Sequence, residues 1–141
     1  RIFNTYGPRM RLNDGRALPA FIGQALRGED LTVFGDGSQT RSFCYVDDLI
    51  DGLQKFMATD DEVIGPLNLG NPVEYKIMDL ARIIVAMTGS KSQIMQTTLP
   101  QDDPKQRNPN ITKASQHLSW VPTTPLDDGL TKTIKYFRKI V

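Results

Sequence analysis

The sequence predicts a mixed α/β protein, with an α+β-like arrangement of short strands and amphipathic helices. Apolar residues recur at helical spacing in several segments, and short apolar runs bounded by turn residues separate these segments. The strands are too few and too short to form a doubly wound sheet alone. A chain of 141 residues without an internal repeat is therefore expected to be one domain, whose larger sheet would lie upstream.

The first half of the chain predicts two helices among short strands. In order, the expected elements are a strand end at 1–6, a helix from about 19 to 26, strands at 31–34 and 41–45, and a helix from about 47 to 58. Pro19 suits the first turn of the first helix, and Gly28 suits its end. Helical spacing predicts that the apolar face of the second helix consists of Leu49, Ile50, Leu53, Phe56 and Met57.

The second half of the chain predicts three further helices. In order, the expected elements are a strand at 66–69, a helix at about 77–88, an extended segment at 93–99, a loop at 101–110, a short helix ending at 118 and a last helix starting at 124–127. Thr112 and Thr124 are the expected N-terminal caps of the last two helices, with Pro125 at the first position of the final helix. The buried stripe expected for the final helix is Leu126, Leu130, Ile134 and Phe137.

Composition argues against several functional classes. A net charge of +1 gives no overall attraction to nucleic acid or to an anionic membrane, and the aromatic residues are too scattered for a single-strand nucleic-acid platform. The longest apolar run, residues 83–87, is too short to span a bilayer. Cys44, the single cysteine, cannot form an internal disulfide, and His117 has no supporting partners for a metal site. We therefore expect no metal, no nucleic-acid partner and no membrane segment in this chain.

The stretch from residue 35 to residue 49 organises the sequence. It predicts a glycine turn, a strand that carries one arginine, and a helix start with two carboxylates. Arg41, the arginine in this strand, presents a planar and permanently charged fork that suits phosphate. A salt bridge to Asp47 or Asp48 is the alternative role for this side chain.

Two other segments carry candidate ligand groups. Asn4 and Thr5 follow a predicted strand, which is where ligands of open α/β sheets bind, although a turn before Gly7 also explains them. Arg107 lies in a predicted loop, where an arginine is usually solvated. The residues alone leave both alternatives open.

Five motifs together resemble one enzyme family. They are RIFNTYGPRM at 1–10, NDGR at 13–16, the stretch at 35–49, LNLGNP at 67–72 and QDDPKQR at 101–107. In this order the chain resembles the sugar-nucleotide branch of the extended short-chain dehydrogenase/reductases (the NAD-dependent epimerase/dehydratase family), and most of all the UDP-glucuronate decarboxylases. The glycine-rich loop is absent, and no tyrosine is followed by a lysine four residues later, so the resemblance covers only the C-terminal part of such an enzyme.

The resemblance implies a fold and an activity. The chain would be the C-terminal substrate-binding part of an extended Rossmann-fold enzyme, with 1–12 ending the Rossmann half and 13–141 binding substrate. The implied reaction of the whole enzyme is oxidation of UDP-glucuronate at C4 by bound NAD, loss of carbon dioxide, and re-reduction to UDP-xylose. The absent half would bind most of the NAD, and we expect the chain alone to be inactive.

The resemblance also implies roles for individual residues. Arg41 and Arg107 would clamp the diphosphate, and Arg41 would also assist protonation after carbon dioxide leaves. Asn110 stands where the family commonly has an aspartate, so the ribose contact there loses its charge. The further implied substrate contacts are Asn4, Leu31, Thr32, Val33 and Phe34, and the implied cofactor contacts are Thr5, Arg11 and Arg16.

Two alternative functions remain open. A nucleotide-sugar 4-epimerase or a dTDP-glucose 4,6-dehydratase would share the scaffold and the C4 oxidation, although the runs at 38–41 and 102–104 favour the decarboxylase. A non-catalytic nucleotide-sugar binding module is the alternative from another class. The resemblance implies a cytoplasmic homodimer for the whole enzyme, with any membrane anchor or targeting signal outside this chain. Because some helices would pack on the missing half, the isolated chain is expected to self-associate or to keep mainly the contacts of the small domain.

Overall fold

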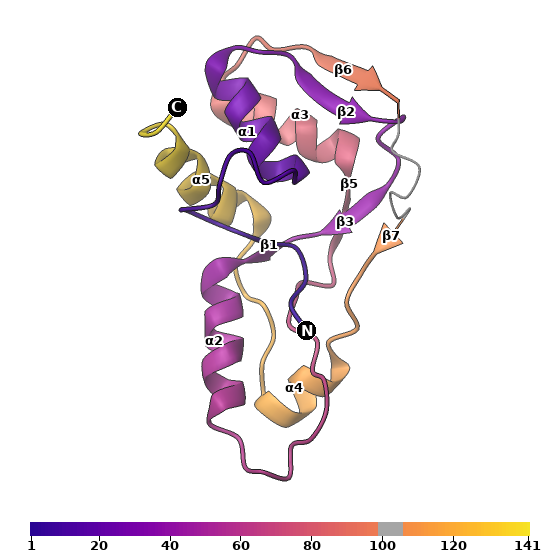
Figure 1. Ribbon diagram of the computed structural model, residues 1–141, viewed down its shortest axis with the longest axis vertical. Coiled ribbons are helices and arrows are strands. Elements are labelled where there is room, and N and C mark those ends of the chain that lie inside the picture. The colour runs from indigo at the N-terminus through magenta and orange to yellow at the C-terminus, as the bar shows by residue number, and fades with distance from the viewer. Residues whose placement is uncertain (99–105) are drawn as a thin grey trace.

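The computed structural model describes residues 1–98 and 106–141 and is elongated, with a larger upper part and a smaller lower part (Figure 1). The upper part holds three helices, α1 (Ala17–Arg27), α3 (Ile77–Thr88) and α5 (Leu126–Phe137). The lower part holds α2 (Val46–Met57) and α4 (Thr112–Leu118).

Within the described ranges, the strands form small sheets between these helices. β1 (Thr5–Tyr6) pairs in parallel with β4 (Cys44–Tyr45), and β2 (Leu31–Phe34) pairs in parallel with β6 (Ile94–Thr97). In the third sheet, β3 (Thr40–Ser42) lies between antiparallel β5 (Glu74–Lys76) and parallel β7 (Gln106–Arg107). This third sheet crosses the middle of the molecule (Figure 1).

Two apolar clusters fill the interior. The larger cluster lies among α1, α3 and α5 and includes Phe21, Leu80 and Phe137. The smaller cluster lies under α2 and α4 around Trp120, whose indole N–H donates a hydrogen bond to the backbone carbonyl of Asp48 (2.9 Å). Both clusters bury large side chains, which is the main source of stability for a chain of this size.

The helix predictions are confirmed. α3 spans residues 77–88 as its apolar period predicts, and the stripe predicted for α5 is buried. Gly28 and Gly89 end α1 and α3 in the left-handed conformation, with φ of 71° and 69°. A residue without Cβ adopts this conformation without steric cost, so local sequence is sufficient to end both helices.

Two strand predictions and one loop prediction were wrong in detail. The strand expected at 41–45 is divided into β3 and β4, because the two segments pair with different partners. The strand expected at 66–69 is reduced to a single bridge between Leu69 and Ile2. The loop expected at 101–110 contains β7, and residues 101–105 of that loop lie outside the described residues.

Both predicted helix caps were also wrong. Thr112 is the first residue of α4, and its N–H donates to Oδ1 of Asn110 (2.9 Å). Thr124 does not cap α5, because Pro125 occupies the N-cap position and no side-chain hydrogen bond caps the helix. The N–H of Thr124 instead donates to Oδ2 of Asp48 (3.0 Å).

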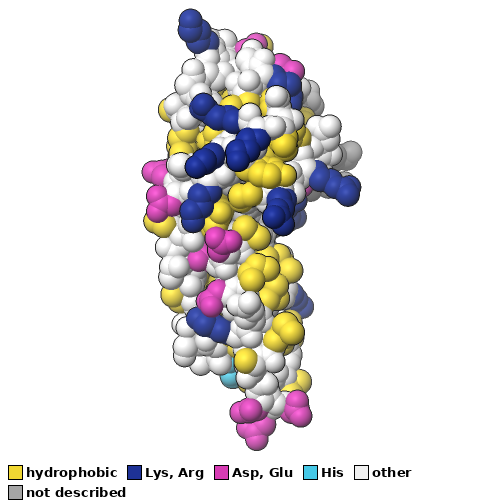
Figure 2. All heavy atoms as spheres, turned by 90° about the vertical axis from the view of Figure 1, so that its left-hand side faces the viewer, with side chains coloured by type: hydrophobic (Ala, Val, Ile, Leu, Met, Phe, Trp, Pro, Cys, Tyr) yellow, Lys and Arg dark blue, Asp and Glu magenta, His cyan; other side chains and the backbone are white. Residues whose placement is uncertain are grey.

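The apolar face predicted for α2 is only partly covered. Leu49 is buried, but Ile50 is 46% exposed and Met57 is 84% exposed. Apolar side chains are visible along the lower half of the face that includes α2 (Figure 2). Uncovered apolar surface of this kind is a feature of interfaces, so self-association of the chain stays a prediction.

Candidate functional site

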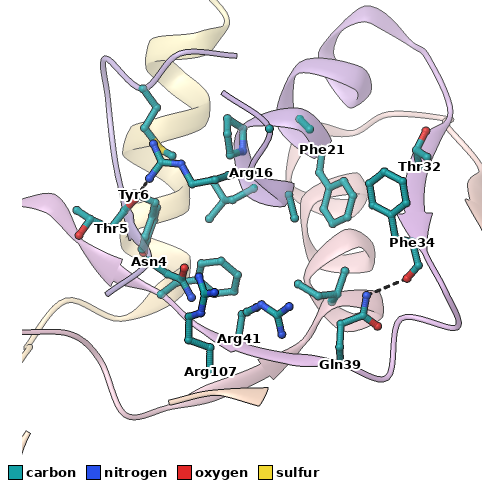
Figure 3. Close-up of a pocket in the computed structure, with 18 of the residues that line it drawn as sticks. Asn4, Thr5, Tyr6, Arg16, Phe21, Thr32, Phe34, Gln39, Arg41 and Arg107 are labelled. Atoms are coloured by element: carbon teal, nitrogen blue, oxygen red, sulfur yellow. Dashed lines mark hydrogen bonds between the residues drawn. The ribbon is translucent and has the colours of Figure 1, made fainter. Parts of the chain in front are cut away.

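A cavity of about 620 Å³ opens among α1, β2, β3 and the N-terminal segment (Figure 3). Seven residues predicted as ligand contacts line it. They are Asn4, Thr5, Arg16, Thr32, Phe34, Arg41 and Arg107. The cavity therefore gathers side chains from segments that are far apart in the sequence.

Two arginines meet at one end of the cavity. Arg41 on β3 and Arg107 on β7 are register partners in a parallel pair, so both side chains project from the same face of the sheet. Figure 3 shows the guanidinium group of Arg107 beside Asn4 and that of Arg41 next to it, on the side toward Gln39. Arg41 also donates a hydrogen bond from Nη1 to the carbonyl of Thr40 (2.7 Å). Two permanent positive charges at one place form a site suited to an anion with several oxygens.

The edge of β2 forms the opposite end of the cavity. The N–H groups of Leu31 and Gly35 donate toward β6, so the backbone groups of Thr32 and Phe34 face the other edge. Thr32 and Phe34 both line the cavity, and Phe34 is 48% exposed. Val33, between them, points into the apolar core and is fully buried. This end offers an aromatic surface together with backbone hydrogen-bonding groups.

Two glutamines that the sequence reasoning missed complete this edge. Gln24 on α1 accepts from the N–H of Thr32 (3.2 Å) and donates to its hydroxyl (3.1 Å). Gln39 donates from Nε2 to the carbonyl of Phe34 (2.8 Å; Figure 3). Gln24 had a sequence signal, because it lies three residues after Phe21 within an otherwise apolar helix face.

Asn4 carries an unsatisfied polar group. Its Nδ2 is buried and has no hydrogen-bond partner among the described residues, although the side chain lines the cavity. The backbone carbonyl of Asn4 accepts from the N–H of Cys44 (3.1 Å), which fixes this segment beside β4. A buried amide donor without a partner is costly, so an acceptor on a ligand would remove the penalty.

Arg16 lies at the junction of this cavity with a second hollow of about 420 Å³. Its Nη1 donates to the carbonyl of Thr5 (3.1 Å), and its Nε donates to Oδ2 of Asp14 (2.7 Å). Partial burial of Asp14 raises the pKa of its carboxyl, but hydrogen bonds from Arg16 outweigh this effect and lower the pKa below its ordinary value. Thr5 and Arg16 line both hollows.

The remaining predicted contacts lie elsewhere. Leu31 and Val33 are fully buried core residues, so only their strand, and not their side chains, reaches the cavity. Arg11 and Asn110 line neither hollow. Oδ1 of Asn110 instead accepts a hydrogen bond from the N–H of Thr112, the first residue of α4. The ligand contacts proposed for these four residues stay predictions.

Other reactive groups have structural surroundings. Burial raises the pKa of the Cys44 thiol to about 12, so Cys44 stays protonated as the expected packing residue. Burial also raises the pKa of Tyr6, whose hydroxyl donates to the carbonyl of Leu126 (3.3 Å). His117 is exposed in the last turn of α4. In the part of the chain that the structure describes, no group of His, Cys, Asp and Glu side chains could hold a metal ion.

Comparison with known proteins identifies the family. Residues 1–70 match the model of the NAD dependent epimerase/dehydratase family. The chain belongs to this family. It is a mixed α/β piece that corresponds to the C-terminal part of extended Rossmann-fold enzymes, as its motifs predict.

Curated relatives match almost the whole chain. UDP-glucuronic acid decarboxylase 1 of Xenopus tropicalis is 53% identical over 139 residues, which are 99% of this chain and 32% of the relative. UDP-glucuronic acid decarboxylase 5 of Arabidopsis thaliana is 49% identical over 98% of this chain and 40% of the relative. The chain thus spans between about a third and two fifths of the length of these relatives.

Solved structures of the family share the fold. The UDP-glucuronic acid 4-epimerase of Bacillus cereus, in complex with UDP-glucuronic acid and NAD, has a TM-score of 0.92 at 34% identity. The UDP-glucose 4-epimerase of Thermotoga maritima, with UDP-glucose, has a TM-score of 0.93 at 30% identity. The matches cover 100% and 99% of this chain, and 45% of each solved chain. Among residues 1–98 and 106–141, no helix has the length and apolar character needed to cross a bilayer.

Proposed function

We propose that the chain is the substrate-binding part of an NAD-dependent enzyme that converts UDP-glucuronate to UDP-xylose. The observation that carries this proposal is the cavity with a pair of arginines at one end and an aromatic strand edge at the other. The names of the curated relatives support a decarboxylase of UDP-glucuronate. The volume of about 620 Å³ is suited to a ligand of this size.

The two ends of the cavity suggest the orientation of the nucleotide. The diphosphate would lie between Arg41 and Arg107, where charge-assisted hydrogen bonds are available. The base would lie against Phe34, next to the backbone edge of β2. The sugar would then approach Asn4, whose buried Nδ2 would donate to it.

The second hollow is suited to part of the cofactor. Thr5 and Arg16 line it together with Asn4 and Arg107. Arg16 already binds Asp14 and the carbonyl of Thr5, so an anionic dinucleotide would share its guanidinium with these groups. When bound, NAD would supply the hydride acceptor and donor for the sugar. The chain's own contribution is to orient the sugar nucleotide and to neutralise its charge, with Arg41 also stabilising developing charge at the sugar. Because the chain has no Tyr-x-x-x-Lys sequence, we expect it to be inactive alone.

Calorimetric titration of the chain with UDP, UDP-glucuronate and dTDP tests the binding proposal. Arg41→Ala and Arg107→Ala should each weaken UDP binding about 10- to 100-fold, because each removes hydrogen bonds to a charged group. Arg82→Ala is the matched control, since Arg82 is exposed on α3 and pairs with Asp79 (3.3 Å). Failure to bind UDP, both by the chain and by a longer polypeptide that adds the nucleotide-binding half, would refute the proposal.

A 4-epimerase is the second candidate. Two structural neighbours in complex with a UDP-sugar are 4-epimerases, and the matches cover 99% and 100% of this chain. Incubation of the longer polypeptide with UDP-glucuronate and NAD separates the two functions. A decarboxylase yields UDP-xylose and carbon dioxide, whereas an epimerase yields the C4 epimer and retains the carboxylate.

A further inference from the structure

One carboxylate connects all three strands of the β5-β3-β7 sheet. Oε1 of Glu74 on β5 accepts from the hydroxyl of Thr40 on β3 (2.6 Å) and from Nε2 of Gln106 on β7 (3.0 Å). Oε2 accepts from the same amide of Gln106 (2.8 Å) and from Nδ2 of Asn108 (3.0 Å). An ionised carboxylate only accepts hydrogen bonds, so it matches a ring of three donor side chains.

Strand alternation separates this network from the arginines. Gln106 and Asn108 flank Arg107, so their side chains point to one face of the strand and the side chain of Arg107 points to the other. Thr40 and Arg41 on β3 alternate in the same way, and the Cα register pairs Thr40 with Gln106 and Arg41 with Arg107. The carboxylate therefore binds the face of the sheet opposite the cavity.

The short β7 strand depends on such contacts. It has two residues, which form few ladder hydrogen bonds, and a strand of this length has little intrinsic stability. Three further hydrogen bonds hold the segment: Gln106 and Asn108 each donate to Glu74, and the hydroxyl of Ser42 donates to the carbonyl of Arg107 (3.2 Å). The hydrogen bond from Thr40, followed by those from Asn108 and Gln106, lowers the pKa of Glu74, which keeps the carboxylate ionised at neutral pH.

We propose that Glu74 is a positioning residue, whose carboxylate holds β7 in register on β3 and thereby directs Arg107 into the cavity beside Arg41. The inference rests on the proposed function, because it takes Arg107 as a ligand of the diphosphate. Glu74 itself lies on the other face of the sheet and touches no substrate. Its effect on binding must therefore pass through Arg107.

A double-mutant cycle with UDP as the probe tests this route. Glu74→Ala should weaken UDP binding about fivefold, a smaller loss than that of Arg107→Ala, because the guanidinium remains present but is less well placed. In the Arg107→Ala background, Glu74→Ala should have no further effect. Glu29→Ala is the matched control, since Glu29 is an exposed carboxylate paired with Arg27 (2.8 Å) at the end of α1. The cycle is measured on the chain, or on the longer polypeptide if only that form binds UDP.

The outcomes separate the two proposals. An unchanged UDP affinity in Glu74→Ala, or an equal loss in both backgrounds, overturns the positioning role. An unchanged affinity in Arg107→Ala instead overturns the diphosphate assignment of the proposed function. Glu74→Gln guards against misfolding, because it keeps the side-chain size but replaces one acceptor oxygen with a donor. It should retain the thermal midpoint and still lose UDP affinity, and full affinity in this variant would count against the proposal.

Discussion

Replacing Asn4 with leucine should stabilise the unliganded chain and weaken its binding of the sugar nucleotide. The buried Nδ2 of Asn4 has no hydrogen-bond partner in the described structure, and such a group costs about 1–3 kcal/mol. Leucine has a similar volume and no polar atoms, so Asn4→Leu should remove most of this penalty. A gain of about 1–2 kcal/mol would raise the melting temperature by roughly 3–8 °C for a chain of this length.

The same substitution should have the opposite effect on ligand binding. Loss of a hydrogen bond to the sugar should weaken UDP-glucuronate binding about 5- to 10-fold, with a much smaller effect on UDP, which lacks the glucuronate. Differential scanning calorimetry measures the first effect, and isothermal titration measures the second. Asn68→Leu is the control, because Nδ2 of Asn68 already donates to the carbonyl of Asn110 (2.9 Å) and the side chain lines neither hollow. That variant should gain no stability.

Two results would refute this reasoning. A melting temperature for Asn4→Leu at or below that of the unsubstituted chain would show that Nδ2 is not an uncompensated donor. An unchanged affinity for UDP-glucuronate would show that Asn4 does not contact the sugar.

Three further predictions concern the framework of the site. Gly129→Ala should destabilise the chain by about 1–3 kcal/mol, because the added Cβ would lie 2.7 Å from Cζ of Tyr6; thermal unfolding measures the loss, and an unchanged midpoint would contradict it. Asp48→Ala should lower the free energy of unfolding by about 2–4 kcal/mol in a denaturant titration, because it removes the hydrogen bonds from the hydroxyl of Thr123 (3.1 Å) and from the N–H of Thr124 (3.0 Å). An equally large loss on replacing an exposed carboxylate would argue against this cause. Burial raises the pKa of Cys44 from 9.0 to about 12, so the unfolded chain releases the thiol proton at a lower pH than the folded chain. The contribution of the protonated thiol to the free energy of unfolding is therefore full below about pH 9 and is lost between pH 9 and 12. Unfolding measured over that range should show a smaller decline for Cys44→Ala, and an equal decline in both proteins would exclude the thiol as a cause.

Local sequence determined the helices more completely than the strands. The boundaries of α3 follow from its apolar period and from Gly89, which lies next to it in sequence. β7 had no local signal, because two polar residues become a strand only through pairing with β3 and the hydrogen bonds to Glu74. The strand expected at 41–45 was divided for a related reason: its two halves meet different partner strands, which lie far away in the sequence.

The candidate site followed from sequence only where a motif carried it. Arg41 and Arg107 are separated by 65 intervening residues, and nothing in their spacing shows that they meet; the resemblance to a family suggested it, and the β3–β7 register brings them together. Gln39 and Glu74 were missed because a lone polar residue beside a short strand resembles a solvated one. Their importance depends on which backbone edge or strand lies opposite, and that is a property of the tertiary structure.

The alternation of side chains in the β5-β3-β7 sheet explains how so short a sheet can build a charged site. Two like charges placed together repel each other, so the guanidinium groups of Arg41 and Arg107 gain nothing from their proximity unless an anion lies between them. The β3–β7 register places them side by side, and contacts away from the charges add to its stability. Glu74 provides such contacts from the opposite face, where its carboxylate binds neutral donors and does not compete for either guanidinium. Because this carboxylate lies on the face of the sheet opposite the cavity, it fixes the spacing of β3 and β7 without occupying the space into which Arg107 projects.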